Sequence, residues 1–268
     1  MGLCWSSGDK KMSRNYIKLN ELGKTNYSQV TKRVRVGTYQ MVAVKKYYKR
    51  RCNMERVRNE MSILAEVSHP SVMKMLENEE NKQKIYVVLE YIKGRTLRET
   101  LVLRRVLEAE NVRKVVTKLL DALAYLHSIK ICHMDVKTSN VMVSPEFVDV
   151  KLIDFGNAKK FPGENPVTHS KSGTARFAAP EFGLSAGCCP FKADVWSLGV
   201  VFAHAASPAA RRLNIAVFVA DMRNSLKEKM EEDCGDEGVV RTVGRMCSYH
   251  PSVRPSAEKL NADWSETL

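Results

Sequence analysis

The sequence of 268 residues lacks the features of transmembrane, secreted and zinc-binding proteins. No apolar run approaches the about 20 residues that a helix needs to cross a bilayer, so we expect no transmembrane segment. The N-terminus turns polar after Trp5, which excludes a secretory signal peptide. The seven cysteines are odd in number and show neither a CxxC pair nor a zinc-type Cys/His spacing. We therefore expect free thiols in a reducing compartment, on the cytosolic side.

The positive charge of the chain is concentrated near its N-terminus. Residues 1–60 hold 15 Lys and Arg against 4 Asp and Glu, a net charge of +11, whereas the other 208 residues carry only +2. Such a basic segment indicates an anionic partner, either lipid, nucleic acid or phosphate, or else a solvated face. A nucleic-acid site requires basic residues interleaved with aromatic ones, and only residues 47–51, Tyr-Tyr-Lys-Arg-Arg, fit this pattern. We expect no nucleic-acid partner.

The N-terminal residues suggest a lipid anchor. The chain begins MGLCWSS, which fits the acceptor pattern for N-myristoylation of Gly2 after removal of Met1. One myristoyl chain binds a membrane only weakly, so a second signal is required. Cys4 is a candidate for palmitoylation, and basic residues follow at positions 10, 11 and 14. These signals predict a protein anchored to the cytoplasmic face of a membrane.

The hydrophobic pattern changes along the chain from strand-like to helix-like. Short runs at 16–19, 29–36 and 41–46 alternate with turns and predict β-strands. Apolar residues between Val112 and Leu126 recur with a helical period and predict a long amphipathic helix. Beyond Asp194 the pattern is mostly helical. We therefore expect an α+β protein with two lobes.

Polar motifs stand between these elements in a defined order. Lys45 ends the apolar run VAVK, and Glu60 lies on the apolar face of a predicted helix fifteen residues later. A carboxylate on such a face is costly unless it is paired, so we expect an ion pair between Glu60 and Lys45. The later motifs are HMDVKTSN at 133–140, DFG at 154–156, GTARFAAPE at 173–181, DVWS at 194–197 and Arg-Pro at 254–255.

These motifs resemble the signature set of the eukaryotic protein kinase superfamily over about residues 16–262. Signatures of the VAIK, HRD, DFG and APE types occur in the kinase order and with kinase-like intervals. The resemblance implies a bilobal α+β fold, with a β-rich N-lobe containing one key helix at about 16–90 and a mainly helical C-lobe at about 94–262. Residues 1–15 would form a leader, and 263–268 a short tail.

The resemblance also implies the reaction, transfer of the γ-phosphoryl group of ATP to Ser/Thr hydroxyls of proteins, with Mg²⁺ as cofactor. Lys137, two residues after Asp135, and Gly173-Thr174 before the APE motif resemble the Ser/Thr class rather than the Tyr class. We expect a monomer whose partners are protein substrates and a membrane surface. The alternative is a pseudokinase that acts as a nucleotide-binding scaffold. Pseudokinases usually lose at least one of the polar residues of the kinase motifs, whereas this sequence keeps all of them, namely Lys45, Glu60, Asp135, Asn140 and Asp154.

Residue roles follow from the same resemblance. Asp135 would orient the substrate hydroxyl, Lys137 would steady the γ-phosphate, and Lys45 would hold the α- and β-phosphates with Glu60 orienting it. The residues that would bind Mg²⁺ are Asp154 and Asn140. The residues that would bind ATP are Leu22, Gly23, Val30, Ala43, Lys45, Leu89 as gatekeeper, Glu90 and Ile92 in the hinge, and Met142.

Other motif residues would support the site without touching the nucleotide. An ion pair between Glu181 and Arg254 would hold the substrate-binding segment, and Asp194 would brace the catalytic loop. The remaining structural residues of these motifs are Phe155, Gly156 and Thr174.

Two motifs depart from the family pattern. The loop that should cover the phosphates keeps only Gly23, with Thr25 and Ser28 at the other glycine positions. Glycine lets backbone amides approach phosphate closely, so we expect a stiffer loop and weaker ATP binding. Met134 replaces the arginine of HRD, which in the family often pairs with a phosphate on the activation segment. We therefore expect activity that does not depend on phosphorylation of residues 154–181.

Overall fold

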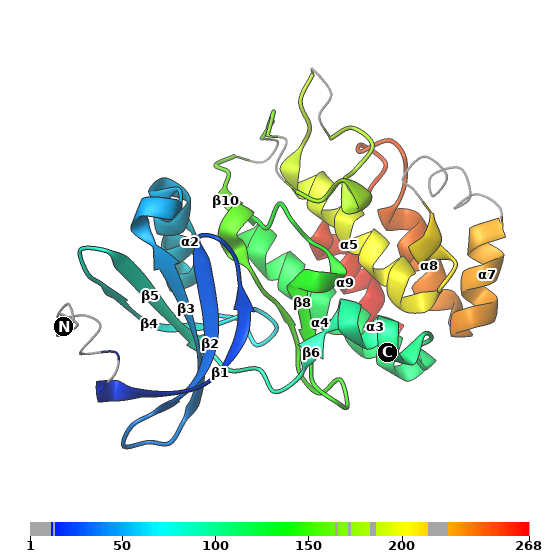
Figure 1. Ribbon diagram of the computed structural model, residues 1–268. Coiled ribbons are helices and arrows are strands. Elements are labelled where there is room, and N and C mark those ends of the chain that lie inside the picture. The colour runs from blue at the N-terminus through cyan, green and yellow to red at the C-terminus, as the bar shows by residue number, and fades with distance from the viewer. Residues whose placement is uncertain are drawn as a thin grey trace. The chain divides into compact units, whose positions relative to one another are not determined.

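The structure, a computed structural model, describes residues 12, 14–163, 166–170, 173–182, 186–213 and 225–267 (Figure 1). Gly2 and Cys4 lie outside the described residues. The chain forms two compact units, a first unit of residues up to Ser68 together with Met73–Tyr91, and a second unit of His69–Val72 with Ile92–Leu268. No helix in the described part of the chain is long and apolar enough to cross a membrane. The six cysteines among these residues are free thiols.

The first unit is built on an antiparallel sheet with the strand order β1-β2-β3-β5-β4. Its strands are β1 (Tyr16–Lys24), β2 (Ser28–Arg35), β3 (Met41–Tyr48), β4 (Met75–Glu80) and β5 (Lys84–Glu90). On β3, Lys45 lies opposite Val30 of β2, and Ala43 lies opposite Leu89 of β5. Opposed residues share a face of a sheet, as do residues two apart on one strand, so these four side chains lie on one face.

The opposite face of this sheet carries an apolar cluster that includes a residue from before β1. Val42 and Val44 of β3 are completely buried in an apolar cluster with Tyr86 and Val88 of β5. Met12 belongs to this cluster and is itself buried. Met12, four residues before the first strand, is therefore packed into the first unit.

Helix α2 (Met54–Glu66) is the long helix of the first unit and follows the short 3-10 helix η1 (Lys49–Arg51). Its start is defined by Asn53, whose side chain accepts a hydrogen bond from the backbone N–H of Arg56 at 3.0 Å. This is an N-cap, which satisfies a donor that has no partner within the helix. The buried face of α2 carries Glu60 among apolar residues.

The second unit is mainly helical. Its helices are α3 (Leu97–Arg104), α4 (Ala109–Ser128), α5 (Pro190–Ala206), α7 (Ser225–Cys234), α8 (Glu237–Met246) and α9 (Ala257–Ser265). Its short strands are β6 (Arg95–Thr96), β7 (Ile131–Cys132), β8 (Val141–Val143), β9 (Val150–Leu152) and β10 (Lys159–Lys160), and its 3-10 helices are η2 (Thr138–Asn140), η3 (Phe155–Asn157), η4 (Ala175–Phe177) and η5 (Ala210–Arg212). Together with the sheet of the first unit, this confirms the predicted α+β class.

Helices α4 and α5 form the centre of the second unit. The predicted helical period is confirmed in α4, where Val112, Val116, Leu119 and Leu126 are all buried. Helix α5 is buried over nearly its whole length, and α4, α8 and other elements pack around it. A helix that is apolar all round belongs in the interior of a domain. Asp194 lies on this buried helix, so its carboxylate requires partners in the protein.

Candidate active site

The first unit contains the ion pair expected between Lys45 and Glu60. The Lys45 Nζ lies 2.8 Å from the Glu60 Oε1, and both side chains are largely buried. Strand β3 places Lys45 on the sheet face that also carries Val30 and Ala43, while α2 supplies Glu60 from its buried face. In such a buried position the attraction between the two charges is stronger than at the surface, because little water screens it.

The turn between β1 and β2 is closed by the two residues that replace glycines of the family pattern. The Thr25 Oγ1 accepts a hydrogen bond from the Ser28 N–H at 3.0 Å, and the two hydroxyl oxygens lie 2.9 Å apart. The Thr25 N–H donates to the Ser28 carbonyl at 2.9 Å. A Cβ on Gly23 would have no neighbour within 4 Å, so the fold itself does not require glycine at that position. The backbone amides of Thr25 and Ser28 thus already have partners within the turn.

Replacing both Thr25 and Ser28 by glycine is expected to strengthen Mg²⁺–ATP binding by about three- to tenfold. The change removes the side-chain acceptor that occupies the Ser28 amide, a bond that contributes about 0.5–1.5 kcal/mol. Binding of a fluorescent ATP analogue to the purified protein measures the effect. Thr38→Gly, in the turn between β2 and β3, is the matched control and should leave the affinity unchanged. Equal or weaker binding by the double variant would contradict this account of the turn.

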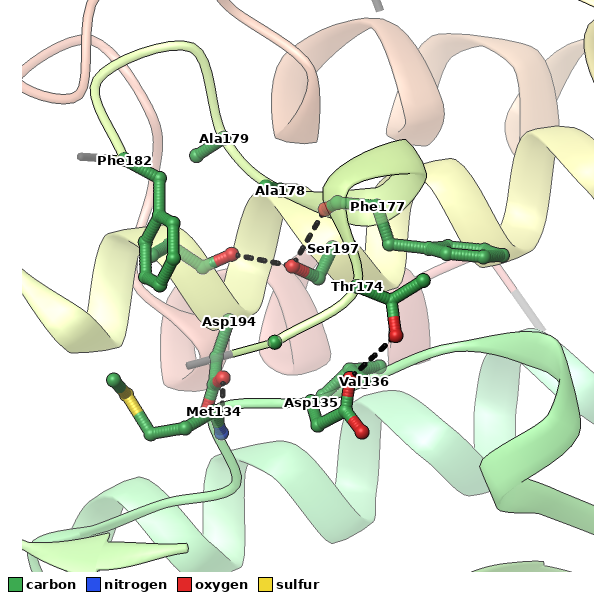
Figure 2. A pocket seen from close by; sticks show the side chains of 12 residues that line it. Met134, Asp135, Val136, Thr174, Phe177, Ala178, Ala179, Phe182, Asp194 and Ser197 are labelled. Carbon is green, nitrogen blue, oxygen red and sulfur yellow. Dashed lines mark hydrogen bonds between the residues drawn. The ribbon is translucent and has the colours of Figure 1, made fainter. Parts of the chain in front are cut away.

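Asp194 of α5 binds the backbone of the catalytic loop, residues 133–140 of the second unit. The two carboxylate oxygens accept hydrogen bonds from the backbone N–H groups of His133, at 2.6 Å, and Met134, at 2.9 Å. Met134 has a φ of 63°, in the left-handed region that a residue with a side chain rarely adopts. The two bonds to the buried carboxylate stabilise this backbone conformation, and Figure 2 shows the one to Met134.

Asp135 stands at the centre of a compact polar cluster. Its Oδ1 accepts a hydrogen bond from the Thr174 hydroxyl at 2.9 Å, which Figure 2 shows, and its Oδ2 lies 2.7 Å from the Lys137 Nζ. The Lys137 Nζ also donates to the Thr174 Oγ1 at 2.9 Å. The Asn140 Nδ2 donates to the backbone oxygen of Asp135 at 2.9 Å. Three residues assigned from the sequence, Lys137, Asn140 and Thr174, therefore surround Asp135.

The DFG segment lies next to the catalytic loop within the second unit. Asp154 follows β9 with a φ of 63°, and the preceding Ile153 N–H donates to the Asn140 carbonyl at 2.8 Å. Phe155 is fully buried, and its ring packs edge-on against His133 with 4.9 Å between centroids. The His133 Nε2 is 3.0 Å from the Ile153 carbonyl, so this nitrogen donates and His133 is a packed side chain rather than a base.

The donor set of Asp154 and Asn140 fits a magnesium ion. Carboxylate and amide oxygens are the ligands that Mg²⁺ prefers. The Asn140 Nδ2 is directed to Asp135, which orients the amide and leaves its oxygen as the atom available to a cation. The observed hydrogen bonds of Asn140 are therefore compatible with metal binding.

The expected ion pair between Glu181 and Arg254 is present and buried. The Arg254 NH1 and NH2 lie 2.5 and 2.7 Å from the two Glu181 carboxylate oxygens, and no part of the Arg254 side chain is exposed. The guanidinium also donates to the carbonyls of Ser248 and Tyr249, and it lies 4.8 Å from the ring of Trp196. The pair ties residue 181 to the chain before α9.

A small pocket opens beside Asp135. Its lining is mixed, with apolar side chains such as Phe177 and Phe182 beside the polar Thr174 (Figure 2). Ser197 of α5 donates to the Phe177 carbonyl at 2.8 Å and so holds this wall in place.

The residues expected around adenine divide between the two units. Leu22 and Gly23 on β1, Val30 on β2, Ala43 on β3, and Leu89 and Glu90 on β5 belong to the first unit, whereas Ile92 and Met142 belong to the second. Ala43 and Leu89 are buried and Leu22 is exposed. The Glu90 carboxylate accepts a hydrogen bond from the Lys74 N–H at 2.8 Å, so its side chain is occupied within the first unit.

Sequence reasoning missed one residue in the site, Tyr47. Its hydroxyl donates to the Glu60 Oε2 at 2.5 Å in a buried position. The available signal was the strand period, which places Tyr47 on the same face as Lys45. In the sequence, Tyr47 stands out only as the first residue of the aromatic and basic run at 47–51.

Comparison with known proteins identifies the family. The family model described as the protein kinase domain matches residues 16–264. The serine/threonine-protein kinase cds1 of Schizosaccharomyces pombe is 26% identical over 97% of this chain and 60% of its own length. CBL-interacting protein kinase 11 of Oryza sativa subsp. japonica is 33% identical over 68% of this chain and 37% of its own length, and sperm motility kinase 3A of Mus musculus 35% over 69% and 36%. The matches thus span 60% or less of these relatives, and the chain belongs to the protein kinase domain family.

Proposed function

We propose that this protein is a serine/threonine protein kinase that transfers the γ-phosphoryl group of ATP to protein hydroxyls, through residues 16–262. The observation that carries the proposal is the cluster of Lys137, Thr174 and Asn140 around the Asp135 carboxylate, to which the Asn140 Nδ2 donates at 3.3 Å. A lysine two residues after the aspartate, as Lys137 follows Asp135, is typical of the Ser/Thr class of protein kinases rather than the Tyr class. The relative cds1 bears the description serine/threonine-protein kinase in its name.

The arrangement suits phosphoryl transfer because this reaction depends on positioning and charge neutralisation. The Asp135 Oδ1 accepts a hydrogen bond from Thr174, and a carboxylate oxygen can accept a further bond from a substrate hydroxyl. Asp135 would thus orient this hydroxyl and take its proton. Lys137, already 2.7 Å from Asp135, would place its charge beside the transferred phosphoryl group.

The phosphates of ATP would be held by the remaining polar residues. Lys45, oriented by Glu60, would bind the α- and β-phosphates. Mg²⁺ bound to Asp154 and to the Asn140 oxygen would neutralise phosphate charge. Asp194 takes no part in the chemistry but holds the backbone that carries Asp135.

Transfer of radiolabelled phosphate from ATP to a generic basic protein tests this proposal. Label is expected on Ser or Thr after acid hydrolysis of the product and should be lost in Lys45→Met. A protein that binds Mg²⁺–ATP but transfers no more label than the Lys45→Met variant would instead be a pseudokinase that acts as a nucleotide-binding scaffold. Label on Tyr would overturn the substrate class.

We also propose that acylation of Gly2 and Cys4 anchors the protein to the cytoplasmic face of a membrane. The sequence motif carries this proposal. The exposed Arg14 belongs to the basic residues that would supply a second, electrostatic signal.

Gly2→Ala is expected to move the protein from the membrane fraction to the soluble fraction, since myristoylation requires the N-terminal glycine. Fractionation of cells that produce the tagged protein measures this shift. Ser7→Ala, just outside the acceptor pattern, is the matched control and should stay with the membranes, whereas Cys4→Ser should give partial release because one acyl chain binds marginally. A Gly2→Ala variant that stays with membranes would refute the anchor.

A further inference from the structure

The carboxylate of Glu60 is bound at both of its oxygens. Lys45 interacts with Oε1 at 2.8 Å, and the Tyr47 hydroxyl donates to Oε2 at 2.5 Å. Tyr47 is nearly inaccessible to solvent, as is Glu60. The ring of Tyr47 also lies 5.1 Å from the Lys45 Nζ. The three side chains therefore form one buried unit rather than an isolated ion pair.

The position of Tyr47 follows from the register of the sheet. Lys45 and Tyr47 are two residues apart on β3 and share a face, opposite Val87 and Ile85 of β5. The hydroxyl at the end of the longer side chain reaches the carboxylate on α2. A buried tyrosine hydroxyl and a buried carboxylate oxygen both need a partner, and here each satisfies the other.

We propose that Tyr47 is a positioning residue for the kinase reaction, which holds the Glu60 carboxylate and through it fixes the Lys45 ammonium where the phosphates of ATP bind. The inference rests on the proposed function. Rotation about the last torsion of a glutamate is broad and has little intrinsic preference. A donor on each oxygen removes this freedom, so the carboxylate offers Lys45 a single geometry.

The chemistry of the group is suited to this task. Burial raises the pKa of Tyr47 far above its ordinary value, so the hydroxyl remains protonated and acts as a donor at any working pH. All three members belong to the first unit. The ion pair of Lys45 and Glu60 is therefore held together by residues of that unit and needs no phosphate on residues 154–181. The arginine of the HRD motif, which in the family often pairs with such a phosphate, is replaced here by Met134.

Tyr47→Phe tests the role of the hydroxyl, because it removes one oxygen atom and keeps the ring. The KM for ATP and the dissociation constant of a fluorescent ATP analogue are expected to rise about tenfold, which matches the low end of a hydrogen bond to a charged group. The KM for the protein substrate should not change. A merely structural loss would instead reduce the active fraction, and hence kcat, and leave both KM values unchanged.

Tyr48→Phe is the matched control. Tyr48 is the next residue of β3 and points to the other face, and its contacts are those of its ring with Lys46 and Arg51, which phenylalanine preserves. This variant should bind nucleotide like the wild type. Thermal unfolding of both variants checks that each is folded.

A double-mutant cycle with Glu60→Ala tests whether Tyr47 acts through Glu60. In the Glu60→Ala background, Tyr47→Phe is expected to cause no further loss of nucleotide affinity. Effects that multiply in the double variant, or a Tyr47→Phe variant that binds like Tyr48→Phe, would overturn the inference. Because nucleotide binding is read directly, this result remains distinct from a failure of the protein to transfer phosphate.

Discussion

Asp135→Asn is expected to reduce phosphate transfer by about a thousandfold while Mg²⁺–ATP binding changes little. Asparagine has nearly the same shape but cannot take a proton from the substrate hydroxyl, and a positioned acid–base group contributes about 10²- to 10⁴-fold. It also lacks the charge that holds Lys137 at 2.7 Å. Initial rates with radiolabelled ATP, and binding of a fluorescent ATP analogue, measure the two quantities separately.

Asp149→Asn provides the control for this experiment. Asp149 is an exposed aspartate of the second unit, before β9, and the same chemical change there should leave the rate unaltered. If Asp135→Asn kept more than a tenth of the wild-type rate, Asp135 would not be the group that orients the hydroxyl. If it lost nucleotide binding as well, the effect would be one of folding.

Arg254→Met is expected to lower the free energy of unfolding of the second unit by about 3–5 kcal/mol. The variant leaves the Glu181 carboxylate buried without its partner, and it removes the donors to the carbonyls of Ser248 and Tyr249. The change corresponds to a fall in Tm of about 10 °C for a unit of this size. Circular dichroism during heating, or in increasing urea, measures it.

Two further variants separate the cost of the buried charge from that of the lost packing. Arg245→Met breaks a partly exposed ion pair with Asp263 and should cost less than about 1 kcal/mol. Combining Arg254→Met with Glu181→Gln removes the unpaired charge, so the double variant should be more stable than Arg254→Met alone. Equal losses for Arg245→Met and Arg254→Met would contradict the importance of burial.

The ion pair of Lys45 and Glu60 could be predicted because each is a charged residue in an otherwise apolar pattern. A carboxylate on the apolar face of a helix requires a partner, and the strand before it ends in a lysine. Helix α4 was predictable for a related reason, since its apolar period is unbroken from Val112 to Leu126. In both cases the prediction rests on the apolar pattern of single strands or helices.

The bonds that involve hydroxyl groups could not be predicted in the same way. Tyr47 is an ordinary residue of a β-strand, and its bond to Glu60 depends on how close α2 lies to β3. Likewise, Thr25 and Ser28 were recognised as missing glycines, but their mutual bonds depend on the geometry of the turn. Such contacts are set by tertiary distances that no single segment encodes.

The burial of Met12 sets a length scale for the proposed anchor. Gly2 precedes Met12 by ten residues, and a fully extended chain covers at most about 3.3–3.6 Å per residue. An acyl group on Gly2 would therefore hold the sheet of the first unit within roughly 35 Å of the bilayer. Substrates confined to the same membrane would meet the enzyme at a high effective concentration, whereas proteins further into the solvent would gain nothing from the tether.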